Sequence, residues 1–331
     1  MKIKSIYLSL LCVIALVAVS CDDTQQLIKD PVTKLSNDCI KRTLPTMPNI
    51  VGEYIEFAYG MATPNGRITT VTCEASIPGD EGTYFDPNSY NTDNSGKDVP
   101  VLVCNPSTTS GSTTTITACV DTCAMTMRYY YKIPESARGK KVSFVFTCNS
   151  SANETAQMHM GPYVISKMDM SINQVVKQGE GMYLTFHNPG EAVHVYSQAE
   201  IEANPSLASQ IDLVYGYNAL SDITHAFYNA SAPAELHPDI AFPSGFAAQT
   251  KMMKDYRIKD RQLIDEKNDN VVDDLDFEEK LFEGSQDYCL RLGIEYGIWV
   301  ETADGMYRAF INIKEASAGT MKFGVKRYAM K

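Results

Sequence analysis

Short apolar segments separated by turn-forming residues run through residues 44–170 of this 331-residue chain. They have the length of strands, whereas a helix needs ten or more residues with apolar positions every three or four. In residues 141–147, Val142, Phe144 and Phe146 alternate with the side chains of a second face. Regular short strands with no helical repeat predict an immunoglobulin-like antiparallel β-sandwich. The expected strands are residues 55–59, 68–75, 99–104, 113–120, 125–133 and 141–147.

The second half of the chain, residues 171–331, mixes strand and helix patterns. Asn188-Pro189-Gly190-Glu191 and Asp304-Gly305 each separate two β-forming runs, which predicts two hairpins. Residues 198–210 and 247–264 are expected to be helical, the second with a break near Tyr256. Further strands are expected at residues 211–217, 225–228 and 320–330. We therefore expect an α+β C-terminal domain built on antiparallel strands, in a chain that is mainly β.

The first twenty residues are expected to be a lipoprotein signal peptide. Lys2 and Lys4 precede an apolar stretch, and small residues precede Cys21. This is the pattern of a secretory signal, and the stretch is shorter than the about 20 residues of a membrane-spanning helix. The placement of Cys21 predicts that its thiol carries the lipid, whose acyl chains would hold the protein on a membrane. An ordinary secretory signal with an incidental cysteine is the alternative. Residues 21–43, which are polar and unpatterned, are expected to be a lipidated tether.

The length of the chain indicates how many domains it forms, and its charge indicates which partners it disfavours. A chain of this length exceeds what one core usually serves, which favours two domains, here residues 44–170 and 171–331. The formal net charge of −11 disfavours nucleic acid and anionic lipid headgroups as partners.

Nine cysteines are present, of which Cys12 lies in the signal and Cys21 is the lipid site. The seven others cannot all pair with one another, because their number is odd. We expect most of them to be small buried hydrophobic residues, with room for one disulfide. A zinc site is not expected, since there is no C-x-x-C and no histidine close in sequence to the cysteine group.

An acidic run in residues 265–279 is the densest cluster of oxygen ligands. Such side chains can bind calcium, and Asp273, Asp274 and Asp276 are the candidate ligands. The alternating acids and the turn glycine of a helix–loop–helix calcium site are missing. A charged, solvated loop is therefore the competing interpretation.

Aromatic residues provide the candidate ligand-binding surface, because sugar rings stack on exposed aromatic faces while amides and carboxylates bind their hydroxyls. The candidates are Tyr129, Tyr131, Tyr215, Tyr217 and Trp299. Side chains alternate along a strand, so Tyr130 faces away from Tyr129 and Tyr131, and at least one of the three belongs to the core. For each of these residues a core position is the competing interpretation.

No catalytic motif stands out, and the chain is not expected to be an enzyme. It has no G-x-S-x-G elbow, no glycine-rich phosphate loop and no H-E-x-x-H. His187 and His194 flank a turn and could face each other across paired strands, a geometry that can hold a transition metal. No third ligand is identifiable, so two hairpin histidines on a solvated face are the ordinary explanation.

Several blocks carry a resemblance that covers nearly the whole mature chain. They read DCIKRTLP, IEFAYGMA, MRYYYKIPESARGKKVSF, MGPYVISKMDM, IDLVYGY, VDDLDF and WVETADGMYRAFINI. The chain resembles an uncharacterised family of Bacteroidetes surface lipoproteins and, more distantly, outer-membrane lipoproteins of glycan-utilisation systems that act beside a TonB-dependent transporter. The resemblance implies an outer-membrane location, and Asp22 and Asp23 partly match the acidic pattern that marks export to the cell surface. It implies no established activity.

The sequence therefore leads to a lipid-anchored, surface-exposed outer-membrane binding protein. A glycan is the expected ligand and an outer-membrane transporter the expected partner, with no cofactor apart from the calcium alternative. A structural or assembly lipoprotein without a small ligand is the second hypothesis, and an unrecognised hydrolase is the third.

Overall fold

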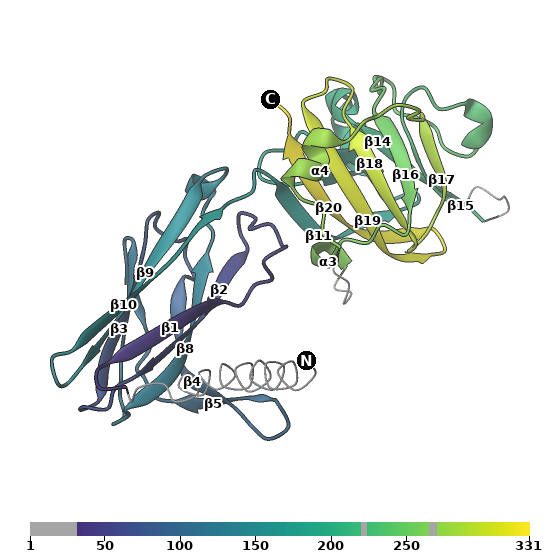
Figure 1. Ribbon diagram of the computed structural model, residues 1–331. Helices are drawn as coiled ribbons and strands as arrows, with labels where there is room; N and C mark the ends of the chain where they lie inside the picture. The colour runs from purple at the N-terminus through teal and green to yellow at the C-terminus, as the bar shows by residue number, and fades with distance from the viewer. Residues whose placement is uncertain (1–31, 220–223, 265–269) are drawn as a thin grey trace, which may run out of the picture.

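The computed structural model of the protein describes residues 32–219, 224–264 and 270–331 (Figure 1). The predicted signal peptide, the lipid site Cys21 and the acidic pair Asp22 and Asp23 lie outside the described residues, as does the segment 265–269 of the acidic run. No helix among the described residues is long and apolar enough to cross a membrane.

The first domain consists of two five-stranded antiparallel sheets with the orders β1-β2-β8-β4-β5 and β10-β9-β3-β7-β6 (Figure 1). The predicted antiparallel β-sandwich is confirmed. Its elements are β1 (Ser36–Lys41), β2 (Tyr54–Ala62), β3 (Ile68–Ala75), β4 (Tyr84–Thr92), β5 (Asp98–Leu102), β6 (Thr108–Ser110), β7 (Thr113–Thr117), β8 (Ala124–Lys132), η2 (Glu135–Ala137), β9 (Lys141–Ser150) and β10 (Thr155–Val164).

The alternation of buried and exposed side chains explains why the two sheets pack face to face. Along β2, β8 and β9, every second side chain is buried and the residues between are half-buried or exposed. The buried set meets at the centre, where the ring of Phe57 lies 4.9 Å from that of Phe144 and 5.3 Å from that of Phe146. Removing these large apolar faces from water is the main driving force for closing the two sheets on each other.

The expected tether is shorter than residues 21–43, because Ser36–Lys41 forms edge strand β1 and pairs antiparallel with β2. Cys39 of this strand is buried in the sandwich core, whereas its neighbour Ile40 points outward and is 59% exposed. A single buried side chain in six residues is too weak a pattern to identify a strand, so the segment reads as unpatterned in the sequence.

The second domain also consists of two five-stranded antiparallel sheets, with the orders β11-β20-β19-β18-β16 and β13-β12-β14-β15-β17. Its main core lies between them. The elements are β11 (Asp169–Lys177), β12 (Gly181–Thr185), β13 (His194–Ser197), α2 (Gln198–Ala203), η3 (Pro205–Gln210), β14 (Leu213–Asn218), β15 (Thr224–Tyr228), η4 (Ala234–Leu236), β16 (Lys251–Tyr256), α3 (Arg261–Ile264), α4 (Asp274–Glu279), β17 (Tyr288–Leu292), β18 (Tyr296–Glu301), β19 (Tyr307–Ser317) and β20 (Thr320–Ala329).

Of the two helices predicted for this domain, the first is present in part and the second is mostly a strand. Residues 198–210 contain α2 and η3, and α2 begins with a capping box in which Ser197 and Glu200 bind each other's backbone amides. The helix expected over residues 247–264 is wrong for most of its length. Residues Lys251–Tyr256 form β16, which pairs antiparallel with β18, and only Arg261–Ile264 is helical. Pairing with a neighbouring strand outweighs a loose helical pattern.

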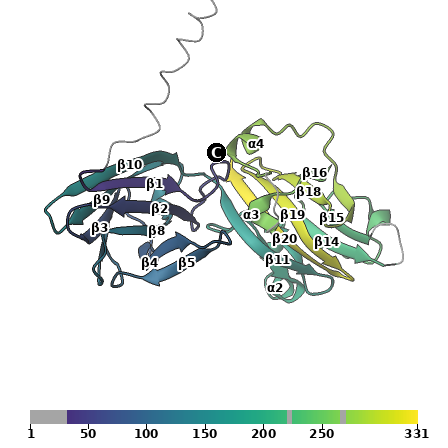
Figure 2. The same cartoon turned by 60° about the horizontal axis from the view of Figure 1, so that its bottom comes forward.

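The two domains lie end to end and touch at one junction (Figure 2). Ser166 donates its hydroxyl hydrogen to Asp274 at the start of α4, and the Lys167 amide donates to the other oxygen of Asp274 at 3.1 Å. Gln262 donates to the Pro48 carbonyl at 3.2 Å. A small apolar cluster of the second domain includes Ile50 from the first domain. The junction therefore combines hydrogen bonds with apolar packing.

Candidate functional site

Most of the aromatic residues predicted to bind ligand belong to the core. The side chains of Tyr129, Tyr131 and Tyr215 are fully buried, Trp299 is 5% exposed, and Tyr217 is half-buried against the His225 ring. Four of the five candidates therefore present no face to a ligand, and their assignment as binding residues is corrected. They occupy the inward positions of their strands, where burial also raises the pKa of the Tyr129 and Tyr131 phenols.

The residue between two of these tyrosines faces the other way. Tyr130 lies on the outer face of the sheet β1-β2-β8-β4-β5, beside Tyr84 of β4 and Tyr54 of β2. The rings of Tyr84 and Tyr130 stack at 4.9 Å with an interplanar angle of 14°, and the ring of Tyr54 meets Tyr130 edge-on at 6.1 Å. Tyr84 is 38% exposed. We call Tyr54, Tyr130 and Tyr84 the tyrosine row.

Charged side chains lie on the same surface, next to the tyrosine row. Arg128 lies over the ring of Tyr90, with its guanidinium carbon 3.6 Å from the centroid, and pairs with Asp98. The hydroxyl of Tyr90 donates to Asp86 at 2.6 Å. Burial, together with this hydrogen bond to a carboxylate, raises the pKa of Tyr90 to about 12. Arg128 therefore holds the face of the Tyr90 ring, and Asp86 holds its hydroxyl. The side chain remains a neutral phenol at physiological pH.

A hollow of about 430 Å³ lies farther along the same outer face. In its floor Gly60 of β2 pairs with Asp38 of β1 on one side and with Thr126 of β8 on the other. Gly60 has no side chain to fill the space between those neighbours. Ser89 and Asn91 of β4 line one part of the wall, and apolar residues such as Met61 and Met125 line another. We call this the polar hollow after the hydroxyls, the two asparagine amides and the carboxylate in its lining.

The tyrosine row and the polar hollow belong to one continuous surface. Tyr130 and Thr126 are four residues apart on β8, which corresponds to about 13 Å along an extended strand. Alternation along β8 places both on the outer face, with Arg128 between them. An aromatic platform at one end and hydrogen-bonding groups at the other are thus presented on the same sheet face.

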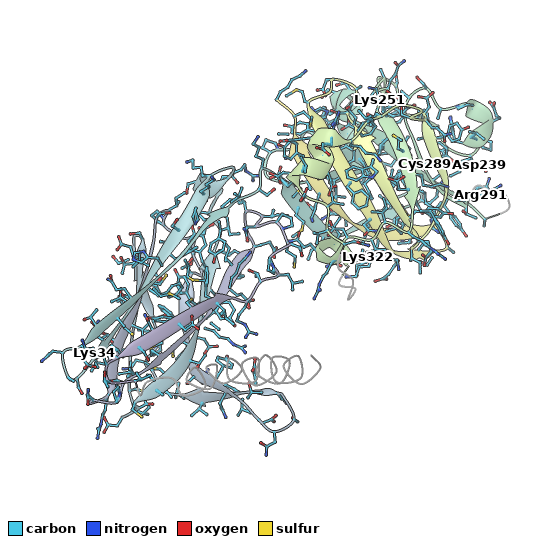
Figure 3. All side chains as sticks on the ribbon, in the orientation of Figure 1. Lys34, Asp239, Lys251, Cys289, Arg291 and Lys322 are labelled. Carbon is cyan, nitrogen blue, oxygen red and sulfur yellow. The ribbon has the colours of Figure 1, made fainter. Side chains whose placement is uncertain are left out.

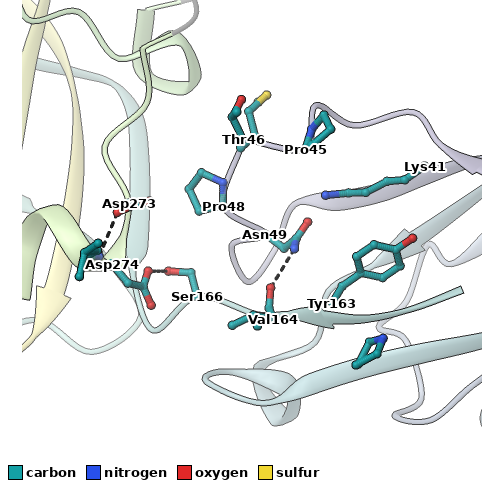
Figure 4. Close-up of a pocket in the computed structure, with 13 residues that line it drawn as sticks. Lys41, Pro45, Thr46, Pro48, Asn49, Tyr163, Val164, Ser166, Asp273 and Asp274 are labelled. Carbon is teal, nitrogen blue, oxygen red and sulfur yellow. Dashed lines mark hydrogen bonds between the residues drawn. The ribbon is translucent and has the colours of Figure 1, made fainter.

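The three aspartates predicted as calcium ligands have separate structural roles. Asp273 caps α4 by accepting hydrogen bonds from the Leu275 and Asp276 amides at 2.9 and 3.1 Å, and Asp276 accepts from the Asp273 amide at 3.0 Å. Asp274 binds the linker between the domains (Figure 4). Within the described residues, no three histidine, cysteine, aspartate or glutamate side chains gather as metal ligands. These three side chains are therefore not assembled as calcium ligands, and the helix cap accounts for Asp273 and Asp276.

The two histidines considered as a metal pair contact different side chains. His187 lies 3.4 Å from the buried carboxylate of Asp212, whereas His194 lies 3.0 Å from Glu191. The hydrogen bond to Asp212 raises the pKa of His187 above its usual value, against the opposing effect of burial. His187 also lies 3.9 Å from Asp304, so the two histidines have different carboxylate partners.

Five of the seven described cysteines are buried, as expected, and Cys119 and Cys123 are exposed. None of the seven forms a disulfide in the part of the chain that the structure describes. Burial raises the pKa of the Cys39 and Cys289 thiols to about 12. Such thiols are poor nucleophiles, because the thiolate is the reactive form.

These features define a two-domain antiparallel β protein whose first sandwich presents an aromatic and polar outer face. Residues 32–165 match a family described as Domain of unknown function (DUF4466), and residues 166–330 match Domain of unknown function (DUF8576). A crystal structure of a DUF4466 family protein from Parabacteroides merdae is 53% identical, covers 91% of this chain and 100% of its own, and superimposes with a TM-score of 0.89. The chain belongs to the DUF4466 family. The predicted resemblance to an uncharacterised family is thereby confirmed.

Other solved structures are much less similar. The major pilin subunit BcpA of Bacillus cereus is 12% identical over 50% of this chain and 51% of its own, with a TM-score of 0.30. The Actinomyces fimbrial adhesin FimA is 12% identical over 46% of this chain and 64% of its own, with a TM-score of 0.24. Likenesses at this level carry no argument about function. No curated protein matches the sequence.

Proposed function

We propose that this protein is a lipid-anchored, surface-exposed outer-membrane binding protein that captures glycans for a nutrient-uptake system. The observation that carries the proposal is the tyrosine row beside the polar hollow on one outer sheet face. The apolar C–H face of a sugar ring stacks on a tyrosine, and hydroxyls, amides and carboxylates bind its hydroxyl groups. The proposal assigns no catalytic step to the chain.

The charge of the outer face favours a neutral glycan. The carboxylate of Asp98 forms ion pairs with Arg128 and Arg42. Arg42 also lies 3.8 Å from the carboxylate of Glu56. Both arginines near the row and the hollow are therefore already paired. Asp38 lies in the polar hollow. A polyanionic chain would therefore meet paired cations between the row and the hollow and a carboxylate at the end of the path. The other cation at the row is Lys132, whose ammonium lies 4.6 Å from the centroid of the Tyr54 ring.

The position of the N-terminal strand suits an anchored protein. Lys34 lies at the end of the first domain that is remote from the second domain (Figure 3). A lipid on Cys21 would be joined to β1 by a segment that reaches at most about 50 Å when fully extended. The first sandwich would then lie next to the membrane, with the second domain beyond it.

Two measurements test the proposal. Lipidated protein is titrated against a panel of neutral and anionic polysaccharides, and the expected result is binding of at least one neutral glycan. Tyr130→Ala should weaken that binding by about two- to tenfold, because an aromatic stacking contact contributes about 0.5–1.5 kcal/mol and about 1.4 kcal/mol corresponds to tenfold. Tyr256→Ala is the matched control, since Tyr256 is an exposed tyrosine of the second domain and lies away from the row. No binding to any polysaccharide, or equal losses in the two variants, would contradict the proposal.

The anchor has its own test. Cys21→Ser should abolish incorporation of labelled palmitate and release the protein from the membrane fraction. Protease added to intact cells should degrade the wild-type protein if it faces outward. A Cys21→Ser protein that stays membrane-bound with label would refute the lipid assignment.

An assembly role is the second candidate, and the edge strand β5 favours it. Val101 and Leu102 of this strand are both more than half exposed, and its outer edge is unpaired within the described residues. Exposed apolar edge strands are sites of pairing with another chain. Concentration-dependent dimers or a ladder in gel filtration, lost in Val101→Lys, would favour assembly, whereas a monomer at all concentrations would exclude this route.

A further inference from the structure

A second hollow, of about 580 Å³, opens at the junction of the domains (Figure 4). The loop after β1 contributes Pro45 and Pro48, β10 contributes Tyr163 and Val164, and α4 contributes Leu275. Val164 and Leu275 are 57% and 56% exposed, so the hollow has apolar side chains from both domains that water contacts. We call it the junction hollow. It shares no lining residue with the polar hollow.

One cation lies in this apolar lining. Lys41, the last residue of β1, extends from the first domain toward the junction (Figure 4). Its ammonium lies 5.4 Å from the centroid of the Tyr163 ring, and no carboxylate of the described residues lies within ion-pair distance of it. Burial lowers the pKa of Lys41. Its neighbour Arg42, by contrast, has two acidic partners.

The opposite wall carries acids that are already occupied. Both oxygens of Asp274 accept hydrogen bonds from the linker between the domains, and one oxygen of Asp273 accepts the amides at the start of α4. An anionic group would be repelled from this wall and attracted to Lys41. The charge distribution thus defines one orientation for a ligand with a single negative end.

We propose that the junction hollow binds a monoanionic amphiphile, with its carboxylate against Lys41 and its hydrocarbon body across Pro45, Val164 and Leu275. The charge complements the unpaired ammonium, and the apolar lining complements the hydrocarbon. A hollow of this size lies in the usual range of small-ligand sites, which often form at domain boundaries. This site is independent of glycan binding, because it uses a different surface and the opposite ligand chemistry.

Decanoate is the probe, and decyltrimethylammonium is the control of equal chain length and opposite charge. Calorimetric titration of the full-length mature protein, below the micelle concentration of each, should show one saturable site for decanoate. The cation should not bind there, although the excess of acidic over basic residues attracts it non-specifically. No saturable decanoate binding, or equal binding of the two amphiphiles, would overturn the proposal.

Two pairs of variants locate the site. Lys41→Met should weaken decanoate binding by about tenfold, because it removes a charge-assisted contact. Lys97→Met, at an exposed turn lysine, should leave binding unchanged. Val164→Asp should weaken binding further by placing a carboxylate at the lip, whereas Leu281→Asp, at a residue 70% exposed outside the hollow, should not.

Thermal unfolding measured on all four variants separates loss of binding from loss of fold. Equal affinity for decanoate in Lys41→Met and wild type would overturn the assignment of Lys41. Equal losses in Val164→Asp and Leu281→Asp would place binding elsewhere. Glycan binding, if present, should persist in saturating decanoate, so failure of one site does not decide the other.

Discussion

Lys326 of β20 places its ammonium 2.7 Å from the carboxylate of Asp260, and both side chains are completely buried. The ammonium also donates to the Val272 carbonyl at 2.8 Å and to the Gln262 side chain at 2.7 Å. Gln262 in turn donates to Pro48 of the first domain. The pair therefore ties a central strand of the second domain to the segment that contacts the junction.

Removing the ammonium should strongly destabilise the second domain. Lys326→Met leaves the Asp260 carboxylate buried without its counterion, which typically lowers the free energy of unfolding by about 3–5 kcal/mol. Trp299 is the single tryptophan of the chain and belongs to β18, so its fluorescence during urea unfolding reports on this domain.

The matched control is Lys322→Met on the same strand. Lys322 pairs at the surface with Glu315 at 3.3 Å, so its loss should change the free energy of unfolding by about 1 kcal/mol or less. The double variant Lys326→Met, Asp260→Asn should be less destabilised than the sum of the two single variants. Additive effects, or equal effects of Lys326→Met and Lys322→Met, would show that the buried pair is not coupled.

The strands that could be predicted from the sequence are those in which alternation is complete. β8 and β9 carry a buried side chain at every second position, and each was expected. Strand β4 was not, because Tyr84–Thr92 contains Pro87, Asn88 and other turn formers and buries only Phe85. Its register with β8 also shifts between Phe85 and Ser89. Local pattern cannot identify a strand whose pairing is irregular and whose partners hold it in place.

The candidate site shows the same limit. Alternation alone indicates that Tyr130 faces away from Tyr129 and Tyr131, and this was inferred. The tyrosine row also needs Tyr54 and Tyr84, which come from strands 76 and 46 residues earlier by their numbering and meet Tyr130 only through the strand register. The junction hollow depends on the docking of two domains, for which the sequence contains no short-range signal.

The pair of His187 and Asp212 predicts a pH-dependent contribution to stability. The pKa of His187 is raised in the folded protein, so the protonated ring stabilises the fold fully below its unfolded pKa of about 6.5. This contribution is lost as the pH rises through the higher folded pKa. The stability difference between wild type and His187→Gln should therefore be larger at about pH 5.5 than at about pH 8.5.

The control for this prediction is His159→Gln, at an exposed position of β10. Asp212→Asn should remove most of the pH-dependent difference that His187→Gln reveals, because it removes the partner that raises the pKa. A difference that grows toward high pH would have the wrong sign and would contradict the assignment.

Thiol reactivity should divide the cysteines into two classes. In native lipidated protein, Cys119 and Cys123 should react rapidly with a disulfide reagent, and the five buried cysteines only after unfolding in urea. Burial and, for Cys39 and Cys289, a pKa of about 12 keep those thiols in the unreactive form. The double variant Cys119→Ser, Cys123→Ser should show no rapid phase. A rapid phase that survives in it would mean that the sandwich core opens readily.

The bonds from Ser166 and Lys167 to Asp274 predict how the junction responds to mutation. Asp274→Ala removes both acceptors, so the Lys167 amide should lose its protection against hydrogen exchange while the strands of both sandwiches keep theirs. Glu279→Gln, an exposed change in the same helix, should leave exchange unaltered. Because Leu275 of α4 also lines the junction hollow, Asp274→Ala should weaken decanoate binding by loosening that wall. Unchanged exchange at Lys167 would mean that the hydrogen bonds to Asp274 do not protect this amide, and that the Gln262–Pro48 bond and the apolar packing around Ile50 suffice to hold the junction.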